Sequence, residues 1–172
     1  LQQQLGRVLS DYAARDPATG YCQSMNYIAG LLLLVSQEEA ETLAAFAAMM
    51  HRYGLSGLFQ EGLPLMMKYC YVCQSQLRHN LPDLHEHFRR FHFRPGQYLH
   101  AWLLTLFVKL LPLRLVQYFW DLILFEGSHA LVTLSLLVLR ACEPFLLFLD
   151  DSEICRFFEL IRMSDKLRPP NG

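Results

Sequence analysis

Apolar residues recur at helical spacing along almost the whole of this 172-residue chain. Positions three and four residues apart are repeatedly apolar, whereas no stretch shows the sustained alternation typical of a half-buried strand. The hydrophobic fraction of 53% favours a wide core, and leucine, a strong helix former, dominates that fraction. No repeat of fixed period argues for a solenoid. The sequence therefore predicts an all-α fold, a single irregular helical domain of about eight or nine helices.

Prolines, glycines and short polar runs mark the expected ends of these helices. The Asp-Pro turn at residues 16–20 separates a first helix from a predicted helix over residues 21–35. Ser36 and Glu39 match a capping box that would open the next helix. Residues 98–111 are predicted to be one helix. Further boundaries are expected at Gly54, Pro64, Pro82, Pro95, Pro112, Gly127 and the polar run Asp150-Asp151-Ser152.

The same pattern predicts the extent of the domain. Residues 27–35 and 131–139 are apolar almost all round, so we expect both segments at the centre of the core. The domain is expected to cover residues 1–165. Residues 166–172, which include two consecutive prolines, are predicted to be a flexible tail.

Charge and composition exclude several classes of function. The net charge is −1, from 15 basic and 16 acidic residues, so the basic excess of a general nucleic-acid binder is lacking. No charge-free apolar stretch reaches the ~18 residues that a membrane span needs, and no secretory signal opens the chain. Five cysteines, an odd number, favour reduced thiols and a cytoplasmic location. A local basic cluster is interpreted as a solvated helix end; it comprises Arg89, Arg90 and Arg94, near His85, His87 and His92.

The most informative segment is Tyr21-Cys22-Gln23-Ser24-Met25-Asn26, where a turn enters an apolar helix. A glutamine at such a junction can extend into solvent while its apolar neighbours anchor the helix. Equally, Gln23 and Asn26 can cap the free backbone N–H groups of a helix start. The residues alone leave both interpretations open.

This hexapeptide resembles the TBC-domain fingerprint Tyr-x-Gln-Gly-Met-Asn, and the flanking segments resemble the same family in the same order. Residues 7–12 and 16–20 are similar to the family's Arg-Val-Leu-x-x-Tyr and Asn-Pro-x-x-Gly. Residues 103–107 and 120–127 are similar to Leu-Thr-Leu-Phe and Trp-Asp-x-x-x-x-Glu-Gly. The resemblance extends from residue 1 to about residue 160.

The resemblance implies a function in GTP hydrolysis. TBC domains stimulate hydrolysis by Rab-type small GTPases, supplying in trans a glutamine that orients the water and an arginine that stabilises the developing charge. The glutamine corresponds to Gln23, whose carboxamide both donates and accepts hydrogen bonds. Tyr21, Ser24 and Asn26 are then expected to shape the loop or contact the partner. The nucleotide and Mg²⁺ would belong to the Rab, so no cofactor is expected for this chain, and any contact with endomembranes would come through the partner.

Two departures from the family pattern leave an alternative open. The arginine belongs to an Ile-x-x-Asp-x-x-Arg motif that nothing here matches, so the domain is expected to be N-terminally incomplete. Such an arginine contributes about 10³–10⁵ in rate. In addition, Ser24 stands where the family has glycine. The alternative is therefore a catalytically inactive, TBC-like interaction or scaffold module.

A third hypothesis is a zinc-stabilised helical adaptor. Cys70 and Cys73, followed by His87 and His92, nominally match the spacing of a two-Cys, two-His zinc site. A zinc finger carries its cysteines on a β-hairpin, however, whereas these cysteines follow a helical apolar pattern. We therefore predict buried or half-buried thiols and no metal ligands.

Overall fold

The computed structural model describes residues 1–161, and all regular elements in that range are helical. This confirms the predicted all-α fold. The last predicted residues of the domain and the predicted tail, residues 166–172, lie outside the described residues. The elements are α1 (Gln2–Arg15), α2 (Met25–Ser36), α3 (Glu39–Arg52), the 3₁₀ helix η1 (Leu55–Leu58), α4 (Pro64–Asn80), α5 (Pro82–Arg90), α6 (Gly96–Leu103), α7 (Leu113–Glu126), α8 (Ala130–Leu146) and α9 (Asp151–Ile161).

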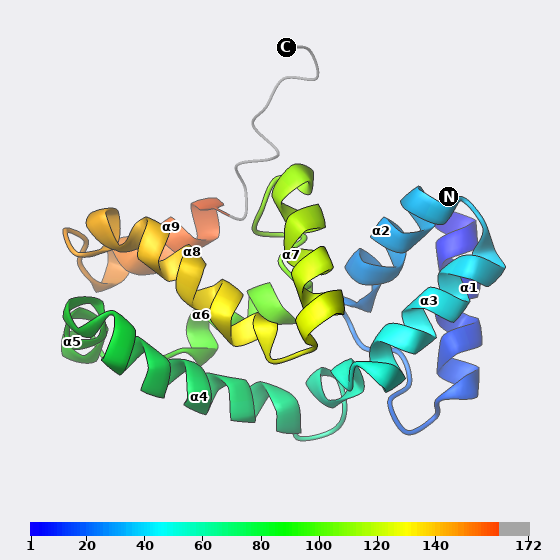
Figure 1. Ribbon diagram of the computed structural model, residues 1–172, viewed down its shortest axis with the longest axis horizontal. Helices are drawn as coiled ribbons and strands as arrows, with labels where there is room; N and C mark the ends of the chain where they lie inside the picture. The colour runs from blue at the N-terminus through cyan, green and yellow to red at the C-terminus, as the bar shows by residue number, and fades with distance from the viewer. Residues whose placement is uncertain (162–172) are drawn as a thin grey trace, which may run out of the picture.

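The helices form an elongated arrangement, in which the chain runs from α1 at one end to α5 at the other, returns to α7 in the middle and runs back through α8 and α9 (Figure 1). Helices α1, α2 and α3 pack on one another at one end, and η1 connects α3 with α4. Helix α4 then runs toward the opposite end, where it contacts α5, α6 and α8. Helix α7 stands in the middle of the view and packs on α8.

An aromatic cluster holds the second half of the molecule together. Tyr98 and Trp102 of α6 are each 1% exposed, and their ring centroids lie 5.1 Å apart. Phe158 of α9 stacks on Phe93 at 5.6 Å and on Tyr98 at 5.4 Å. Phe88 of α5 contacts Phe93 edge-on at 5.0 Å. Phe158 therefore attaches α9 to the α5–α6 region.

The chain does not form the single helix predicted for residues 98–111. Helix α6 ends at Leu103, and Leu106 and Phe107 take left-handed backbone angles, with φ of 43° and 64°. Both residues are fully buried, and the indole Nε1–H of Trp120 on α7 donates to the Leu106 carbonyl at 2.9 Å. Burial and this tertiary hydrogen bond offset the left-handed conformation, so local helix propensity gives the wrong answer here.

The predicted capping box at Ser36 and Glu39 is also wrong. Ser36 is the last residue of α2, and its Oγ lies 2.7 Å from the Oγ1 of Thr42. Glu38 is the N-cap of α3, and Glu39 makes an ion pair with Arg7 of α1. By contrast, the polar cap predicted for α9 is confirmed, because Asp150 accepts the Glu153 N–H at 2.9 Å and Glu153 accepts the Asp150 N–H at 3.0 Å.

Helix α2 is less buried than its sequence indicates. Ile28 and Ala29 are fully buried, but Leu34 and Val35 are 57% and 73% exposed. The apolar surface therefore continues from the core onto the outside of α2 at its C-terminal end. Segment 131–139 lies in the core as predicted, except that Thr133 and Leu137 are exposed.

Replacing Phe158 by alanine tests the aromatic cluster. Phe158 is 5% exposed, so Phe158→Ala should leave a cavity and lower the free energy of unfolding by about 3 kcal/mol. Its neighbour Phe157 is half-buried, so Phe157→Ala should cost clearly less. Urea unfolding followed by circular dichroism compares the two variants, and equal losses would contradict this role of Phe158.

Candidate functional site

The Gln23 segment lies in a loop, residues 16–24, that joins α1 to α2. Asp16 anchors the start of this loop. Its Oδ2 accepts the Tyr12 hydroxyl at 2.8 Å, and its Oδ1 accepts the Thr19 N–H at 3.2 Å. The Asp16 carbonyl accepts the Gly20 N–H at 2.8 Å, where Gly20 has a φ of 61° that glycine tolerates readily. The Asp-Pro turn is thus closed on itself and tied to the buried face of α1.

The electrostatics of this anchor favour the charged carboxylate. Hydrogen bonds from Thr19 and Tyr12, together with His51 of α3 at 3.7 Å, hold the pKa of Asp16 below its usual range, although burial acts in the opposite direction. Burial, assisted by the hydrogen bond to Asp16, raises the pKa of the Tyr12 phenol. Asp16 therefore stays ionised at neutral pH and joins α1, the loop and α3.

A tight reversal follows at Cys22-Gln23-Ser24-Met25. The Met25 N–H bonds the Cys22 carbonyl at 3.2 Å, and Ser24 has φ 90° and ψ −20°. These angles are close to the third position of a type II turn, at about +80° and 0°, which favours glycine. Ser24 thus holds the conformation that the family's glycine would favour. Its side chain makes no capping hydrogen bond that would offset the strain within the described chain.

Met25 and Gln23 face opposite environments across this reversal. Met25 is fully buried, and its Sδ lies 3.3 Å from the Cys22 backbone nitrogen. Gln23 is exposed, and no hydrogen bond to its carboxamide occurs among residues 1–161. Of the other predicted partner-binding residues, Tyr21 is 55% exposed, while Ser24 and Asn26 are half-buried. The loop therefore presents Tyr21 and Gln23 outward on a fixed backbone.

A further contact, which sequence reasoning missed, links the start of α2 to a distant part of the chain. The Nζ of Lys109 lies 4.8 Å from the centre of the Tyr27 ring at the start of α2, a cation–π contact. The Trp120 indole donates to the Leu106 carbonyl, so the motif segments at residues 103–107 and 120–127 are joined by a hydrogen bond. No sequence signal indicates Lys109 for this role.

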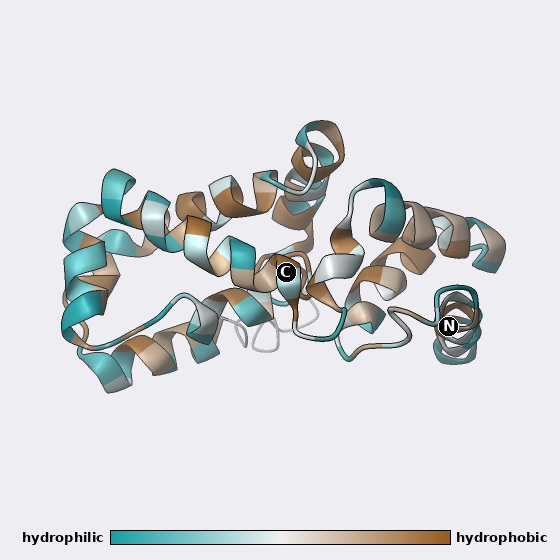
Figure 2. Ribbon diagram, turned by 90° about the horizontal axis from the view of Figure 1, so that it is seen from below, coloured by the Kyte–Doolittle hydropathy of each residue, from teal (hydrophilic) through white to brown (hydrophobic). Residues whose placement is uncertain are grey.

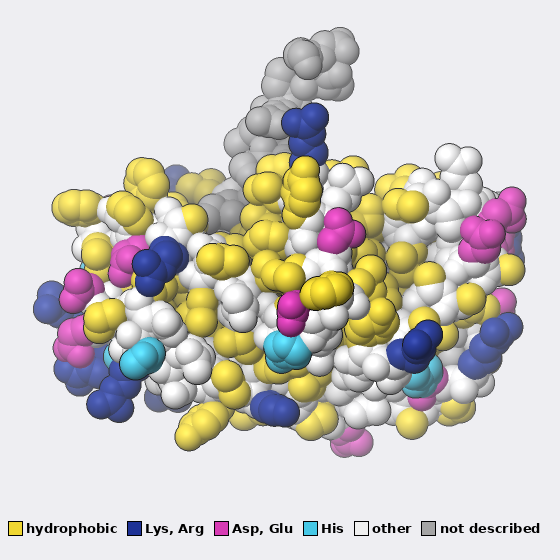
Figure 3. All heavy atoms as spheres, in the orientation of Figure 1, with side chains coloured by type: hydrophobic (Ala, Val, Ile, Leu, Met, Phe, Trp, Pro, Cys, Tyr) yellow, Lys and Arg dark blue, Asp and Glu magenta, His cyan; other side chains and the backbone are white. Residues whose placement is uncertain are grey.

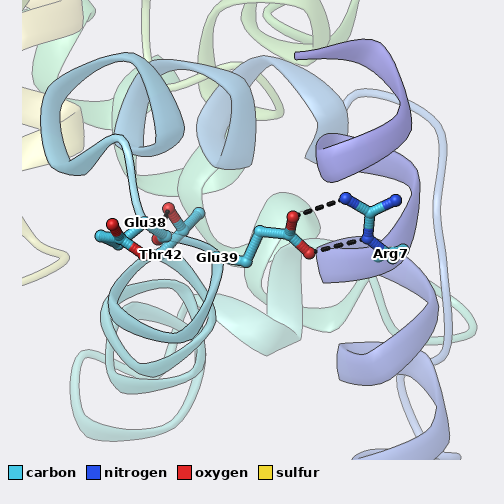
Figure 4. Close-up of polar contacts among 4 residues, drawn as sticks. All are labelled: Arg7, Glu38, Glu39 and Thr42. Carbon is cyan, nitrogen blue, oxygen red and sulfur yellow. Dashed lines mark hydrogen bonds and ion pairs between the residues drawn. The ribbon is translucent and has the colours of Figure 1, made fainter.

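Arg7 and Glu39 fix the relative positions of α1 and α3 (Figure 4). The Arg7 Nε and Nη2 donate to the two carboxylate oxygens of Glu39 at 2.9 and 2.6 Å. The pKa of Glu39 is lowered by this hydrogen bond and by the charge of Arg7. The pair is solvent-exposed and so contributes orientation more than stability. Arg7 is part of the Arg-Val-Leu motif, but its partner is visible only in the folded chain.

The cysteines and histidines of the zinc hypothesis do not meet. Cys70 and Cys73 lie on α4, and burial raises the pKa of the Cys73 thiol to about 11, whereas a zinc ligand must be a thiolate. In the part of the chain that the structure describes, no group of three or more His, Cys, Asp or Glu side chains is placed to hold a metal ion. The zinc-stabilised adaptor is not favoured.

With this geometry established, comparison with known proteins identifies the family. Residues 1–147 match the family described as Rab-GTPase-TBC domain. The chain belongs to this family. The TBC1 domain family member 12 of Xenopus tropicalis is 34% identical over 153 residues, which is 89% of this chain and 22% of that protein. The GTPase-activating protein GYP5 of Saccharomyces cerevisiae is 30% identical over 155 residues, 90% of this chain and 17% of that protein.

Solved TBC domains have the same fold. The Chlamydomonas flagellar RabGAP TBC domain superposes with a TM-score of 0.82 and 24% identity, covering 97% of this chain and 59% of that chain. The Ypt/Rab-GAP domain of Gyp1p superposes with a TM-score of 0.78 and 21% identity, covering 92% of this chain and 58% of that chain. This chain therefore spans a little over half of each solved domain and about a fifth of the matched curated relatives. Within its described helices, none is long and apolar enough to cross a bilayer.

The Asp16 anchor of this TBC domain predicts a specific pH dependence. Because the folded-state pKa of Asp16 is lowered, its contribution to stability is present above the ordinary carboxyl pKa and is lost as the pH falls through the folded value. Asp16→Asn should lower the free energy of unfolding by about 1–2 kcal/mol at pH 7. The difference from wild type should shrink on acidification below about pH 4.

Chemical denaturation over a pH series measures this effect. The exposed Asp121 of α7 provides the control, since Asp121→Asn removes one carboxylate without touching the loop. A constant difference between Asp16→Asn and wild type at all pH values would contradict the electrostatic role.

Replacing Ser24 tests the strain in the reversal. Ser24→Gly removes the Cβ from a left-handed position and should raise the free energy of unfolding by up to about 1 kcal/mol. Ser24→Ala retains the Cβ and should give no gain. Urea midpoints of the three proteins decide the question, and equal stabilities for Gly and Ala variants would show that the turn is unstrained.

Proposed function

We propose that this chain carries the glutamine-bearing part of a surface that stimulates GTP hydrolysis by a Rab-type GTPase. The observation that carries the proposal is the position of Gln23. It is exposed in a tight reversal, with a fully buried Met25 behind it and an ionised Asp16 at the base of the loop. The TBC family and the names of its members, among them the GTPase-activating protein GYP5, support this function.

The chemistry suits a carboxamide held in this way. Hydrolysis of GTP requires a water oriented for in-line attack, and the carbonyl oxygen of an uncharged amide can accept a hydrogen bond from that water while its NH₂ group donates one to a phosphate oxygen. Preorganisation matters because a side chain already held near the productive position loses little entropy in the transition state. The loop supplies that preorganisation through the Met25 anchor and the hydrogen bonds of Asp16. Tyr21, Ser24 and Asn26 are the proposed partner contacts around Gln23.

The conformation of Ser24 bears on whether the site stimulates GTP hydrolysis or only binds the GTPase. Its backbone already holds the left-handed angles of the turn, which supports an active conformation of Gln23. Its hydroxymethyl group adds volume beside Gln23 where glycine has none. This geometry predicts that the chain stimulates GTP hydrolysis and that the Ser24→Gly variant stimulates it more strongly.

Single-turnover GTP hydrolysis by a panel of Rab proteins tests the proposal. The chain is assayed alone and with a family segment bearing Ile-x-x-Asp-x-x-Arg joined ahead of Leu1. Gln23→Ala should reduce the acceleration by about 10²-fold or more, as expected for loss of a group that acts in the transition state, with little change in binding of the GTP-loaded Rab. Gln3→Ala, an exposed glutamine on α1, is the matched control.

The outcomes separate the two functions that the sequence left open. Acceleration that depends on Gln23 supports the proposal. Binding of a Rab without acceleration in either form identifies an interaction module instead. Failure to bind any GTP-loaded Rab overturns the proposal.

A further inference from the structure

A concave site lies at the opposite end of the molecule from α1, between α4, α5 and the segment that joins α5 to α6. It is a cavity of about 200 Å³. Its floor is formed by Leu77, Phe88 and Phe93, which are 2%, 2% and 7% exposed. A water molecule takes about 30 Å³, so the cavity has room for several waters or for one compact polar group.

Basic side chains surround this cavity. Arg89, Arg94, His85 and His92 line it, together with the amide of Gln74. None of the residues lining the cavity is acidic. Space-filling and hydropathy views agree, because Lys and Arg side chains gather at the α5 end in Figure 3 and hydrophilic residues are concentrated there in Figure 2. The chain as a whole has a net charge of −1, so this local excess is a property of the site.

The backbone around the cavity is fixed by hydrogen bonds. The Phe93 N–H donates to the Phe88 carbonyl at 2.8 Å, and the Arg94 N–H donates to the Gln97 side chain at 2.6 Å. His92 between them has a left-handed φ of 54°. His87 serves a different purpose, since its Nε2 lies 2.9 Å from the Leu149 carbonyl and links α5 to the segment before α9.

An acidic side chain outside the cavity, Glu86, would compete with a bound anion for Arg89. Glu86 accepts two hydrogen bonds from the Arg89 guanidinium, at 2.8 and 2.7 Å. Both partners are more than half exposed, so the pair is held weakly and Arg89 can exchange Glu86 for another anion. The Arg94 guanidinium forms no ion pair or hydrogen bond among residues 1–161, since the bond to Gln97 comes from the Arg94 backbone.

Charge and donor number point to the ligand. Two arginines supply two positive charges and two planar sets of N–H donors. A phosphomonoester carries about −1.5 to −2 charges at neutral pH and three strong acceptor oxygens, whereas a carboxylate carries one charge and two oxygens. We propose that this cavity binds a phosphomonoester group, with Arg89 and Arg94 as its principal contacts and His85 and His92 beside them.

Titration calorimetry with two probes tests this site. The probes are soluble inositol monophosphate and phosphatidylcholine vesicles containing a small fraction of phosphatidylinositol monophosphate. Arg94→Ala and Arg89→Ala should each weaken binding about tenfold, the usual effect of losing a charge-assisted hydrogen bond. Glu86→Gln should strengthen binding, because it removes the competing carboxylate. Arg114→Ala, an exposed arginine on α7, is the control and should bind like wild type.

Each result bears on the proposal. Equal affinity for both probes identifies a free phosphomonoester as ligand. A lipid headgroup is identified if the vesicles with phosphatidylinositol monophosphate bind at least tenfold more tightly than both the soluble probe and vesicles of pure phosphatidylcholine. Absence of binding to both probes overturns the proposal. So does an equal loss in Arg114→Ala, or weaker binding by Glu86→Gln, because either result would indicate unspecific attraction. Tighter binding of single-stranded RNA than of either probe would overturn it in favour of a polyanion surface.

Discussion

The carboxylate of Asp16 is the interaction on which the proposed site depends. It lies where α1 ends, and it receives the Tyr12 hydroxyl from the core side and the Thr19 N–H from the loop. His51 approaches it from α3. Asp16 therefore connects the end of α1 and the loop that follows it to α3, which is distant in the sequence. A half-buried charge is stable only when several donors face it, so the loop geometry and the ionisation of Asp16 support each other.

The position of Gln23 depends on burial of a neighbouring side chain and not on a hydrogen-bonded charge. Met25 enters the core completely, and the chain reaches it through a left-handed Ser24. Burial of one side chain thus determines the direction of its neighbour two residues earlier, and Gln23 is left in solvent. Backbone strain at such a position persists only where the surrounding packing enforces it. The same logic operates at Leu106 and Phe107, where burial and the Trp120 hydrogen bond hold two left-handed residues.

The two ends of the molecule differ in their chemistry. The α1–α3 end carries the loop with an uncharged amide at its tip, and its one bidentate ion pair joins Arg7 to Glu39. The α5 end carries a cluster of arginines and histidines around a small cavity. In Figure 1, α2 begins toward the middle of the elongated molecule, whereas α5 lies at one end.

The amino-acid sequence determined the all-α class, the breaks at Pro64, Pro82 and Gly127, the cap of α9 and the identity of the motif around Gln23. These features depend on residues close in sequence, where proline, glycine and capping side chains act directly on the backbone. Tertiary structure decided what depends on distant partners. Helix α6 ends at Leu103 because the Trp120 hydrogen bond stabilises a different conformation in the next turn. Glu39 pairs with Arg7 and does not form the predicted cap. Gln23 faces outward because Met25 is buried. Local periodicity does not predict these three features, because the contacts that stabilise them form only when the chain has folded.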